Sequence, residues 1–305
     1  MIALLFAGQG TQYVGMGKDL YEKYDEFKKV YDIKLPFDLK NLCINGPKET
    51  LDDTKYAQPA IVAMSLGIAR ILEAKGIKAS YLAGLSLGEY GALAYSGVLS
   101  DKDAIELVSK RGDIMSNALP KGTSGMAAVL RLDAEAIKEV IEKVDGVLEI
   151  ANYNCPGQIV ITGDLKAIDE AIPLLQEKGA RRVVKLNVSG AFHSSLLEEA
   201  SIKLGSEIEK VQMNEKNIPV VHNITGTEIS DMSIKDILVK QIKSSVYFEQ
   251  SINYMIERGV DTFIEVGPGE VLAGHVRKTN SNVKVYSINS VESLTKVIEE
   301  LGLNE

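Results

Sequence analysis

Cysteine is scarce in this chain, and its two cysteines indicate neither a metal site nor a disulfide framework. Cys43 and Cys155 lie far apart and in no spacing that is typical of metal ligands. A protein that does not depend on disulfides fits a reducing compartment. We therefore expect a cytoplasmic protein with no metal.

Long apolar runs are missing as well. No segment approaches the roughly 20 uninterrupted apolar residues of a membrane-spanning helix. Residues 1–6 are apolar, but the run is too short for a signal peptide and lacks a basic leader, so it predicts a first buried strand. The chain also shows no internal repeat, and we expect no membrane partner.

Positive charge is in deficit. Lysine and arginine together number 34 against 42 aspartates and glutamates, which gives a net charge of −8. Such a chain has no overall attraction to nucleic acid or to an anionic membrane surface. Its 45% of apolar residues and 25% of charged residues are typical of a globular protein. A length of 305 residues allows one large domain with a smaller companion.

Short apolar runs alternate with helical patterns over most of the chain. Strands are predicted at residues 2–6, 79–83, 219–224, 262–266 and 283–288. This alternation favours a largely parallel sheet with helices on both faces. Turns with Gly8, Ser86 and Gly267 follow three of the strands, so they should gather at the carboxyl edge where ligands bind. Pro59 suits the first turn of a buried helix that ends near Lys75.

The segment at residues 125–188 has a different order. Its patterns read strand, helix, strand, strand, helix, strand, which is the ferredoxin-like arrangement. We therefore predict a large α/β-hydrolase-like core from residues 1–124 and 189–305. A small ferredoxin-like α+β subdomain, residues 125–188, is inserted into that core.

The run Gly84-Leu85-Ser86-Leu87-Gly88 lies between a predicted strand and a predicted helix. A nucleophile at such a sharp turn needs neighbours without side chains, and the amide of Leu87 then points to where an oxyanion forms. Because the chain has 26 glycines, the five-residue pattern alone is a weak signal. Its context favours Ser86 as the nucleophile of an acyl-transfer enzyme; the alternative is a tight turn with a solvated serine.

A serine nucleophile needs a base, and the chain has three histidines. His222 lies in an apolar strand pattern and indicates a structural residue. His275 lies late in a predicted helix, where it would face solvent or a carbonyl. His193 follows a strand and precedes a helical run, which suits a loop at the active edge, but position alone favours it no more than the other two combined. No acid stands out between Ser86 and His193, so a backbone carbonyl could orient the ring.

A transferase for a charged acyl group needs a cation, and the guanidinium fork of arginine binds both carboxylate oxygens. The candidates are Arg70, Arg111, Arg131, Arg181 and Arg182. Arg111 lies in a helix predicted at residues 103–118. From its position alone, the favoured interpretation of Arg111 is a surface charge.

Six different short motifs follow one another along nearly the whole chain. They are Phe-Ala-Gly-Gln-Gly-Thr-Gln at residues 6–12, Gly-Leu-Ser-Leu-Gly-Glu-Tyr at 84–90, Arg-Gly at 111–112, Gly-Met-Ala-Ala at 125–128, Asn-Tyr-Asn-Cys-Pro-Gly-Gln at 152–158 and Val-Gly-Pro-Gly at 266–269. Together they resemble the bacterial malonyl-CoA:acyl-carrier-protein transacylases, which are related to the acyltransferase domains of polyketide and fatty acid synthases.

This resemblance implies roles for individual residues. Ser86 would be the nucleophile and His193 the general base. The amides of Gln9 and Leu87 would form the oxyanion hole. Arg111 would pair with the malonyl carboxylate.

The resemblance also implies three supporting residues. The main-chain carbonyl of Gln241 would orient His193, which answers the missing acid. Phe192, in Ala-Phe-His, resembles the signature of malonyl-selecting members, and Asn154 would face the substrate cleft. Leu85, Ala7 and Gly190 depart from the family pattern, which puts fine selectivity in doubt and not the reaction.

The implied reaction is a ping-pong transfer in fatty acid biosynthesis. Malonyl-CoA acylates Ser86, and the phosphopantetheine thiol of holo acyl carrier protein then accepts the malonyl group. Neither a metal nor a redox cofactor is expected, and we expect a monomer that binds no nucleic acid. Three alternatives remain: an acyltransferase that loads malonyl units for a polyketide pathway, a serine esterase or thioesterase, and a non-catalytic carrier-binding module.

Overall fold

The computed structural model describes residues 1–302, and the chain divides into two compact units. The first unit comprises Met1–Gly112, Val211–Val221 and the chain from Met255 onward. The second unit comprises Asp113–Lys210 and His222–Tyr254. The predicted limits of an inserted subdomain, residues 125 and 188, concern a smaller body within the second unit and stay a prediction.

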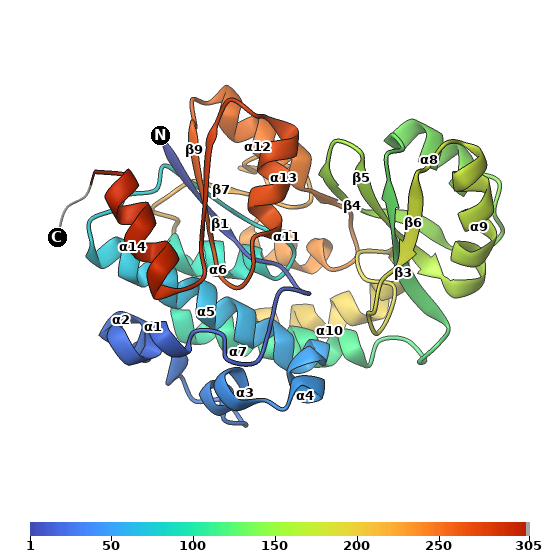
Figure 1. The fold of residues 1–305 in the computed structure, drawn as a ribbon. Helices are drawn as coiled ribbons and strands as arrows, with labels where there is room; N and C mark the ends of the chain where they lie inside the picture. The colour runs from blue at the N-terminus through green and yellow to red at the C-terminus, as the bar shows by residue number, and fades with distance from the viewer. Residues whose placement is uncertain (303–305) are drawn as a thin grey trace. The chain divides into compact units, whose positions relative to one another are not determined.

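The first unit contains a five-stranded sheet in the order β10-β9-β1-β2-β7. Every neighbouring pair in it is parallel, so the predicted parallel sheet is confirmed (Figure 1). The strands are β1 (Ile2–Phe6), β2 (Tyr81–Gly84), β7 (Val220–Val221), β9 (Thr262–Val266) and β10 (Lys284–Ile288). The strand predicted at residues 219–224 is shorter than expected, because the N–H of His222 bonds to the carbonyl of Thr227 and leaves the ladder after Val221.

Strand β1 lies at the centre of this sheet, and Ala3, Leu4, Leu5 and Phe6 are each 0% exposed. Burial on both faces is typical of a parallel strand that helices cover from two sides. Phe6 pairs in register with the last residue of β2 and the last residue of β9. The turns after β1, β2 and β9 therefore leave the sheet at one edge, as predicted.

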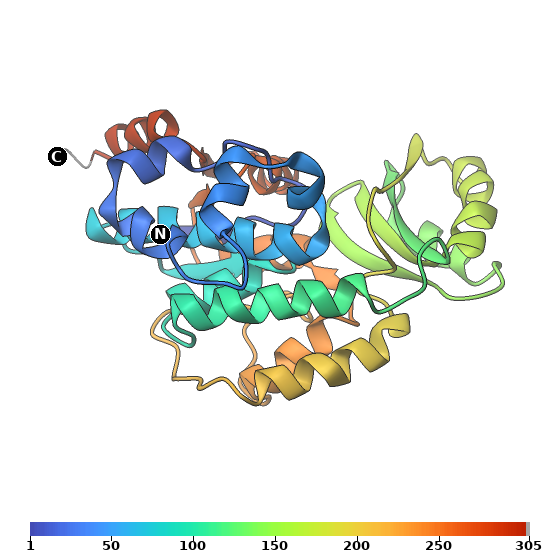
Figure 2. The same ribbon diagram turned by 90° about the horizontal axis from the view of Figure 1, so that it is seen from below.

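Helices cover this sheet. Those of the first unit are α1 (Lys18–Lys23), α2 (Asp25–Tyr31), α3 (Leu39–Asn45), α4 (Lys48–Asp52), α5 (Thr54–Ala74), α6 (Gly88–Tyr95), α13 (Val271–Thr279) and α14 (Val291–Glu300). Helix α7 (Asp101–Ser116) begins in it and α12 (Phe248–Glu257) ends in it. The short helices α2, α3 and α4 pack along α5, as the blue segments of Figure 2 show.

Helix α5 begins earlier than predicted. The side chain of Asp53 accepts the N–H of Lys55 and caps the helix at Thr54, so Pro59 lies inside the helix and not in its first turn. The predicted deep burial is confirmed on most of its faces. Within the described residues, α5 is also the one helix long and apolar enough to cross a membrane by length and composition, and 83% of that stretch is buried inside the structure.

The second unit contains a sheet in the order β6-β3-β5-β4-β8. Its elements are β3 (Ser124–Leu130), α8 (Ala134–Ile141), β4 (Leu148–Cys155), β5 (Gln158–Asp164), α9 (Leu165–Glu177), β6 (Arg182–Lys185), the 3-10 turn η1 (Ser195–Leu197), α10 (Glu198–Ile208), α11 (Ile234–Gln241) and β8 (Val246–Tyr247). The first six follow the predicted strand and helix order. Strand β8, which the pattern did not include, adds to β4 in parallel.

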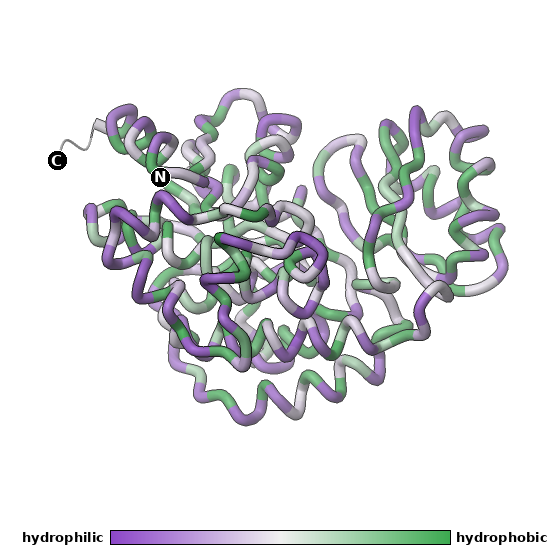
Figure 3. Tube along the Cα trace, turned by 60° about the horizontal axis from the view of Figure 1, so that its bottom comes forward, coloured by the Kyte–Doolittle hydropathy of each residue, from purple (hydrophilic) through white to green (hydrophobic). Residues whose placement is uncertain are grey.

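The helices α8 and α9 of this unit have one apolar face each. Ile137 and Val140 of α8 and Ile168, Ala171 and Leu175 of α9 join one buried cluster with the strands. Their traces alternate between green and purple at the right of Figure 3, as amphipathic helices do. Asp133 caps α8, because its side chain accepts the N–H of Ala136.

Two titratable groups are buried where α13 packs on β9. Glu265 of β9 is 0% exposed and accepts the N–H of Ala273 at 2.8 Å, and burial raises its pKa to about 6. His275 lies in the middle of α13 and is 4% exposed, and burial lowers its pKa to about 4. Of the two surroundings expected for His275, solvent is therefore wrong, and a carbonyl stays a prediction. His275 lies on the buried side of α13, where it and Val276 follow Leu272 by three and four residues.

Candidate active site

Ser86 lies on the sharp turn between β2 and α6. Strand β2 ends at Gly84 and α6 begins at Gly88, so three residues reverse the chain from strand into helix. The φ of Ser86 is 56°, in the left-handed region that residues with a Cβ atom rarely adopt. Such strain persists only where the surroundings hold it, and it concentrates at functional sites.

The two flanking glycines allow this turn to form. A Cβ atom on Gly84 would lie 2.1 Å from the carbonyl carbon of Gly88. A Cβ atom on Gly88 would lie 2.2 Å from the carbonyl oxygen of Phe6, in β1. Backbone therefore packs directly on backbone at both positions, and the weak five-residue pattern has a structural reason.

Arg111 brings a buried cation to the serine. Its guanidinium donates from Nη2 to Ser86 Oγ at 3.0 Å and from Nη1 to Gln58 Oε1 at 2.8 Å. Its side chain also lies over the ring of Tyr90, 5.6 Å from the centroid. Arg111 is 0% exposed, so the favoured interpretation as a surface charge is wrong. Burial lowers the pKa of Arg111, and the nearby Tyr90 and Glu89 offset this only in part. An arginine still keeps its charge in such surroundings.

The burial of Arg111 depends on the glycine that follows it. A Cβ atom on Gly112 would lie 2.6 Å from the carbonyl oxygen of Thr54. Without that atom, α7 approaches the start of α5 closely enough for Arg111 to reach Gln58, one helical turn beyond Thr54. Among the other candidate arginines, Arg70 is bound by Asp101 and Glu73. The remaining three are exposed: Arg131, Arg181 and Arg182.

The turn after β1 lies against the Ser86 turn. The N–H of Leu85 bonds to the carbonyl of Phe6, and a Cβ atom on Gly8 would lie 3.0 Å from the Leu85 side chain. Gln9 follows Gly8, and its side chain donates to Thr54 Oγ1 at 2.9 Å. Within residues 1–302, the backbone N–H groups of Gln9 and Leu87 donate no hydrogen bond to the protein. Both are therefore available as donors to an oxyanion.

His193 belongs to the second unit and has a buried ring. Nδ1 lies 2.9 Å from the carbonyl oxygen of Gln241 and 3.2 Å from that of Ser244. Because a carbonyl oxygen can only accept, Nδ1 carries the proton and Nε2 of the neutral ring is an acceptor. The expected contact with the Gln241 carbonyl is present, and it orients the ring in the way that a base requires.

The other histidines are placed differently. His222 is 0% exposed and its N–H belongs to the bridge with Thr227, while His275 is buried on α13. The two remaining predicted residues, Asn154 and Phe192, are 7% and 6% exposed. Asn154 Oδ1 is buried with no hydrogen-bond partner in the part of the chain that the structure describes.

Sequence reasoning missed Gln58, Thr54 and Ser244. None belongs to a recognisable motif, because each acts through one hydrogen bond to a residue far along the chain. One signal was available for Gln58. It is a polar side chain in an otherwise apolar stretch of a helix predicted to be buried on most sides, where a polar group needs a partner.

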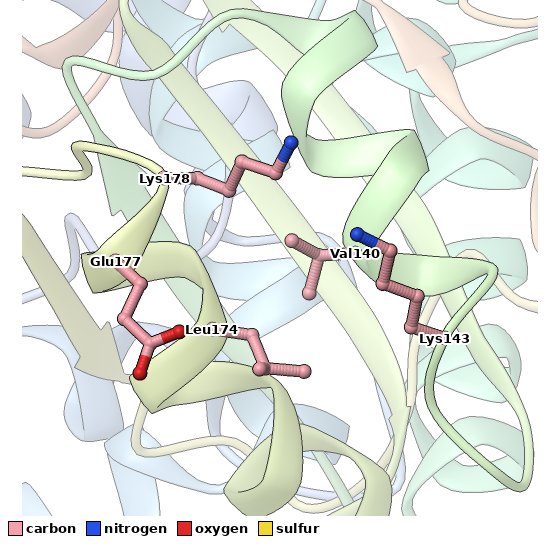
Figure 4. A pocket seen from close by; sticks show the side chains of 5 residues that line it. All are labelled: Val140, Lys143, Leu174, Glu177 and Lys178. Atoms are coloured by element: carbon pink, nitrogen blue, oxygen red, sulfur yellow. The ribbon is translucent and has the colours of Figure 1, made fainter.

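Within the described residues, neither a metal centre nor the hollow between α8 and α9 offers a competing site for acyl transfer. Among residues 1–302, no group of three or more His, Cys, Asp and Glu side chains could hold a metal ion. A hollow of about 270 Å³ lies between α8 and α9, and Val140 and Leu174 form the apolar part of its lining (Figure 4). Lys143, Glu177 and Lys178 complete the lining, which contains no serine, cysteine or histidine.

Comparison with known families agrees with this geometry. A family model described as acyl transferase domain matches residues 3–303. The chain belongs to this acyltransferase family. The acyltransferase is 42% identical over 307 residues to the malonyl CoA-acyl carrier protein transacylase of Bacillus subtilis, a match that covers 98% of this chain and 97% of that protein. The protein of the same name from Staphylococcus aureus strain MRSA252 is 39% identical and covers 96% of each chain.

Solved structures give the same result. The malonyl CoA-acyl carrier protein transacylase of Clostridium perfringens has a TM-score of 0.96 at 43% identity and covers 99% of the acyltransferase and 97% of its own chain. A malonyl-transacylase solved in complex with a type II polyketide synthase acyl-carrier protein has a TM-score of 0.94 at 34% identity, covering 98% and 99%.

Replacing Gly84 tests the backbone packing of the Ser86 turn. Gly84→Ala should lower the free energy of unfolding by about 3 kcal/mol or more, because the new Cβ atom overlaps backbone that cannot move aside. The matched control is Gly274→Ala in α13, where a Cβ atom meets nothing within 4 Å. The control should raise the free energy of unfolding by about 0.5–1 kcal/mol. Urea unfolding measures both, and equal stabilities of the two variants would contradict the packing described.

Proposed function

We propose that this acyltransferase moves the malonyl group of malonyl-CoA to the phosphopantetheine thiol of holo acyl carrier protein. It is an [acyl-carrier-protein] S-malonyltransferase that works through a malonyl ester on Ser86. The observation that carries this proposal is the buried guanidinium of Arg111, which donates to Ser86 Oγ at 3.0 Å.

The position of Arg111 suits a short acyl group with a terminal carboxylate. A malonyl ester on Ser86 places its carboxylate two carbons beyond the serine oxygen, and a cation that already reaches this oxygen can bind that carboxylate. Burying a charge is costly unless it is paired, so an anionic acyl group is a favourable occupant and a neutral one is less so. The arginine fork binds two carboxylate oxygens at once.

In the first half-reaction, Ser86 Oγ attacks the thioester carbon of malonyl-CoA while Nε2 of His193 takes the hydroxyl proton. The negative oxygen that forms on the substrate accepts hydrogen bonds from the N–H groups of Gln9 and Leu87. The carbon–sulfur bond then breaks, and the CoA sulfur leaves with the proton from His193. The carbonyl of Gln241 keeps the ring in the tautomer that this transfer needs.

In the second half-reaction, the thiol of the carrier protein gives its proton to His193 and its sulfur attacks the malonyl ester. Ser86 leaves and recovers the proton. No step calls for a metal or a redox cofactor. Phe192 limits the room beside the α-carbon of the acyl group, and Asn154 offers a buried polar oxygen to the substrate.

Fatty acid biosynthesis in the cytoplasm is the setting that we propose, with the protein as a monomer. The names of its relatives support malonyl-CoA and acyl carrier protein as substrates, and the solved complex of a relative with its carrier protein supports a direct encounter. Cys43 and Cys155 are both buried, which suits a reducing compartment.

Acceptor dependence separates the transferase from a serine hydrolase. Malonyl-CoA alone should be consumed slowly after one equivalent has acylated the protein, because water is a poor acceptor at this site. Addition of holo acyl carrier protein should accelerate consumption by orders of magnitude, with malonylated carrier as the product. Release of free CoA from malonyl-CoA measures this. Equal rates with and without carrier protein would favour a hydrolase.

Loss of the Arg111 guanidinium should affect charged and neutral acyl groups differently. Arg111→Ala should lower malonyl transfer by about 2–4 kcal/mol of transition-state stabilisation and acetyl transfer far less. The matched control is Arg181→Ala, whose side chain is exposed and whose variant should keep both rates. The measurement compares kcat/KM for malonyl-CoA and acetyl-CoA. A uniform loss for both donors would remove Arg111 from carboxylate recognition.

A further inference from the structure

The loop that carries His193 has a conformation that needs support. The φ of His193 is 59°, in the left-handed region that a residue with a side chain adopts only under strain. On one side, the N–H of His193 bonds to the carbonyl of Ile242 at 3.1 Å and its Nδ1 lies on the carbonyl of Gln241. These contacts fix the ring to the end of α11. On the outgoing side, Ser194 Oγ donates to the carbonyl of Ala191 at 2.7 Å, which ties the next residue back to the loop but not to the rest of the unit.

Glu149 holds the outgoing chain. One carboxylate oxygen accepts the backbone N–H of Ser195 at 2.9 Å, and the other accepts the hydroxyl proton of the same residue. Ser195 lies two residues after His193 and begins η1, which continues into α10. A carboxylate is favoured at the N-terminus of a helical segment, where N–H groups lack partners. Two bonds to one residue fix both the position and the rotation of the chain there.

The strand that carries Glu149 also holds the segment whose Ser244 carbonyl faces His193. Glu149 lies in β4 opposite Thr162 of β5, inside a paired ladder. The carbonyl oxygen of the next residue, Ile150, accepts a hydrogen bond from the Ser245 hydroxyl at 2.5 Å. Ser245 follows Ser244, whose carbonyl oxygen lies 3.2 Å from His193 Nδ1. Adjacent residues of one strand thus hold the histidine loop and the segment that orients its ring.

We propose that Glu149 is a positioning residue for the acyl transfer, which acts on His193 through Ser195. The role rests on the function proposed above, in which His193 is the base. With Glu149 in place, the left-handed conformation at His193 is fixed from both sides and Nε2 keeps one direction. Without it, the loop relaxes and proton transfer becomes slower, while the binding of malonyl-CoA stays the same because Glu149 does not touch the acyl group.

The competing explanation is a general effect of negative charge at the start of α10. Glu198 and Glu199 lie in the first turn of α10, so an acidic residue there is not unusual. Glu199 is exposed. It is therefore the matched control, since it has the same charge near the same helix end without the two bonds to Ser195.

Single-turnover acylation of Ser86 by malonyl-CoA, followed by intact mass, measures the effect. Glu149→Ala should lower the maximal rate roughly tenfold, because misplaced catalytic groups lose rate steeply. The half-saturating concentration of malonyl-CoA should stay within about twofold of the wild-type value. Glu149→Gln, which keeps one oxygen acceptor for Ser195, should lose less, and Glu199→Ala should react at the wild-type rate.

A second comparison places the effect on His193. In a His193→Ala background, Glu149→Ala should cause no further loss of the slow residual acylation, because the group that it positions is gone. The proposal is overturned if Glu149→Ala acylates as fast as the wild type, or if it loses the same factor in both backgrounds. Failure of the proposed function gives a different result, namely that the wild type itself forms no malonyl adduct on Ser86.

Discussion

The backbone contact between the Ser86 turn and strand β1 is the constraint on which the first unit depends. Gly84 and Gly88 have no Cβ atom, so this turn lies directly on the backbone beside it. Ser86 is consequently held at a φ of 56° with its oxygen toward the guanidinium of Arg111. A larger residue at Gly84 would push α6 away from β2, and one at Gly88 would push α6 away from β1; either change would move the serine away from its cation. The two glycines of the motif are therefore needed for the strained conformation of Ser86.

Helix α5 connects the parts around the serine. Thr54 and Gln58 lie one turn apart on it, and they bind the side chains of Gln9 and Arg111. Its burial makes these bonds strong, since polar groups away from water are costly without partners. In the second unit, β4 has a similar task, because Glu149 and Ile150 hold the two segments that meet at His193. A helix and a strand thus hold the loops that carry the reactive groups.

Local patterns predicted the parts of the fold that local physics determines. The strand at residues 2–6 was predicted correctly, because an apolar run acts within a few residues. The start of α5, the burial of His275 and the depth of Arg111 were not, because each depends on what packs against the residue. Arg111 in particular looks like a solvated charge until Gly112 is seen to bring α7 onto α5. From position alone His193 was one candidate among three; the family resemblance singled it out, and its ring lies on the Gln241 carbonyl that the resemblance implied.

The central claim is that a malonyl ester forms on Ser86. Intact-mass analysis after brief mixing with malonyl-CoA, in the absence of carrier protein, tests it directly. The wild type should gain the mass of one malonyl group, peptide mapping should place it on Ser86, and Ser86→Ala should gain nothing. Addition of holo acyl carrier protein should then remove the adduct. An unmodified wild type, or an equal adduct on Ser86→Ala, would contradict the claim.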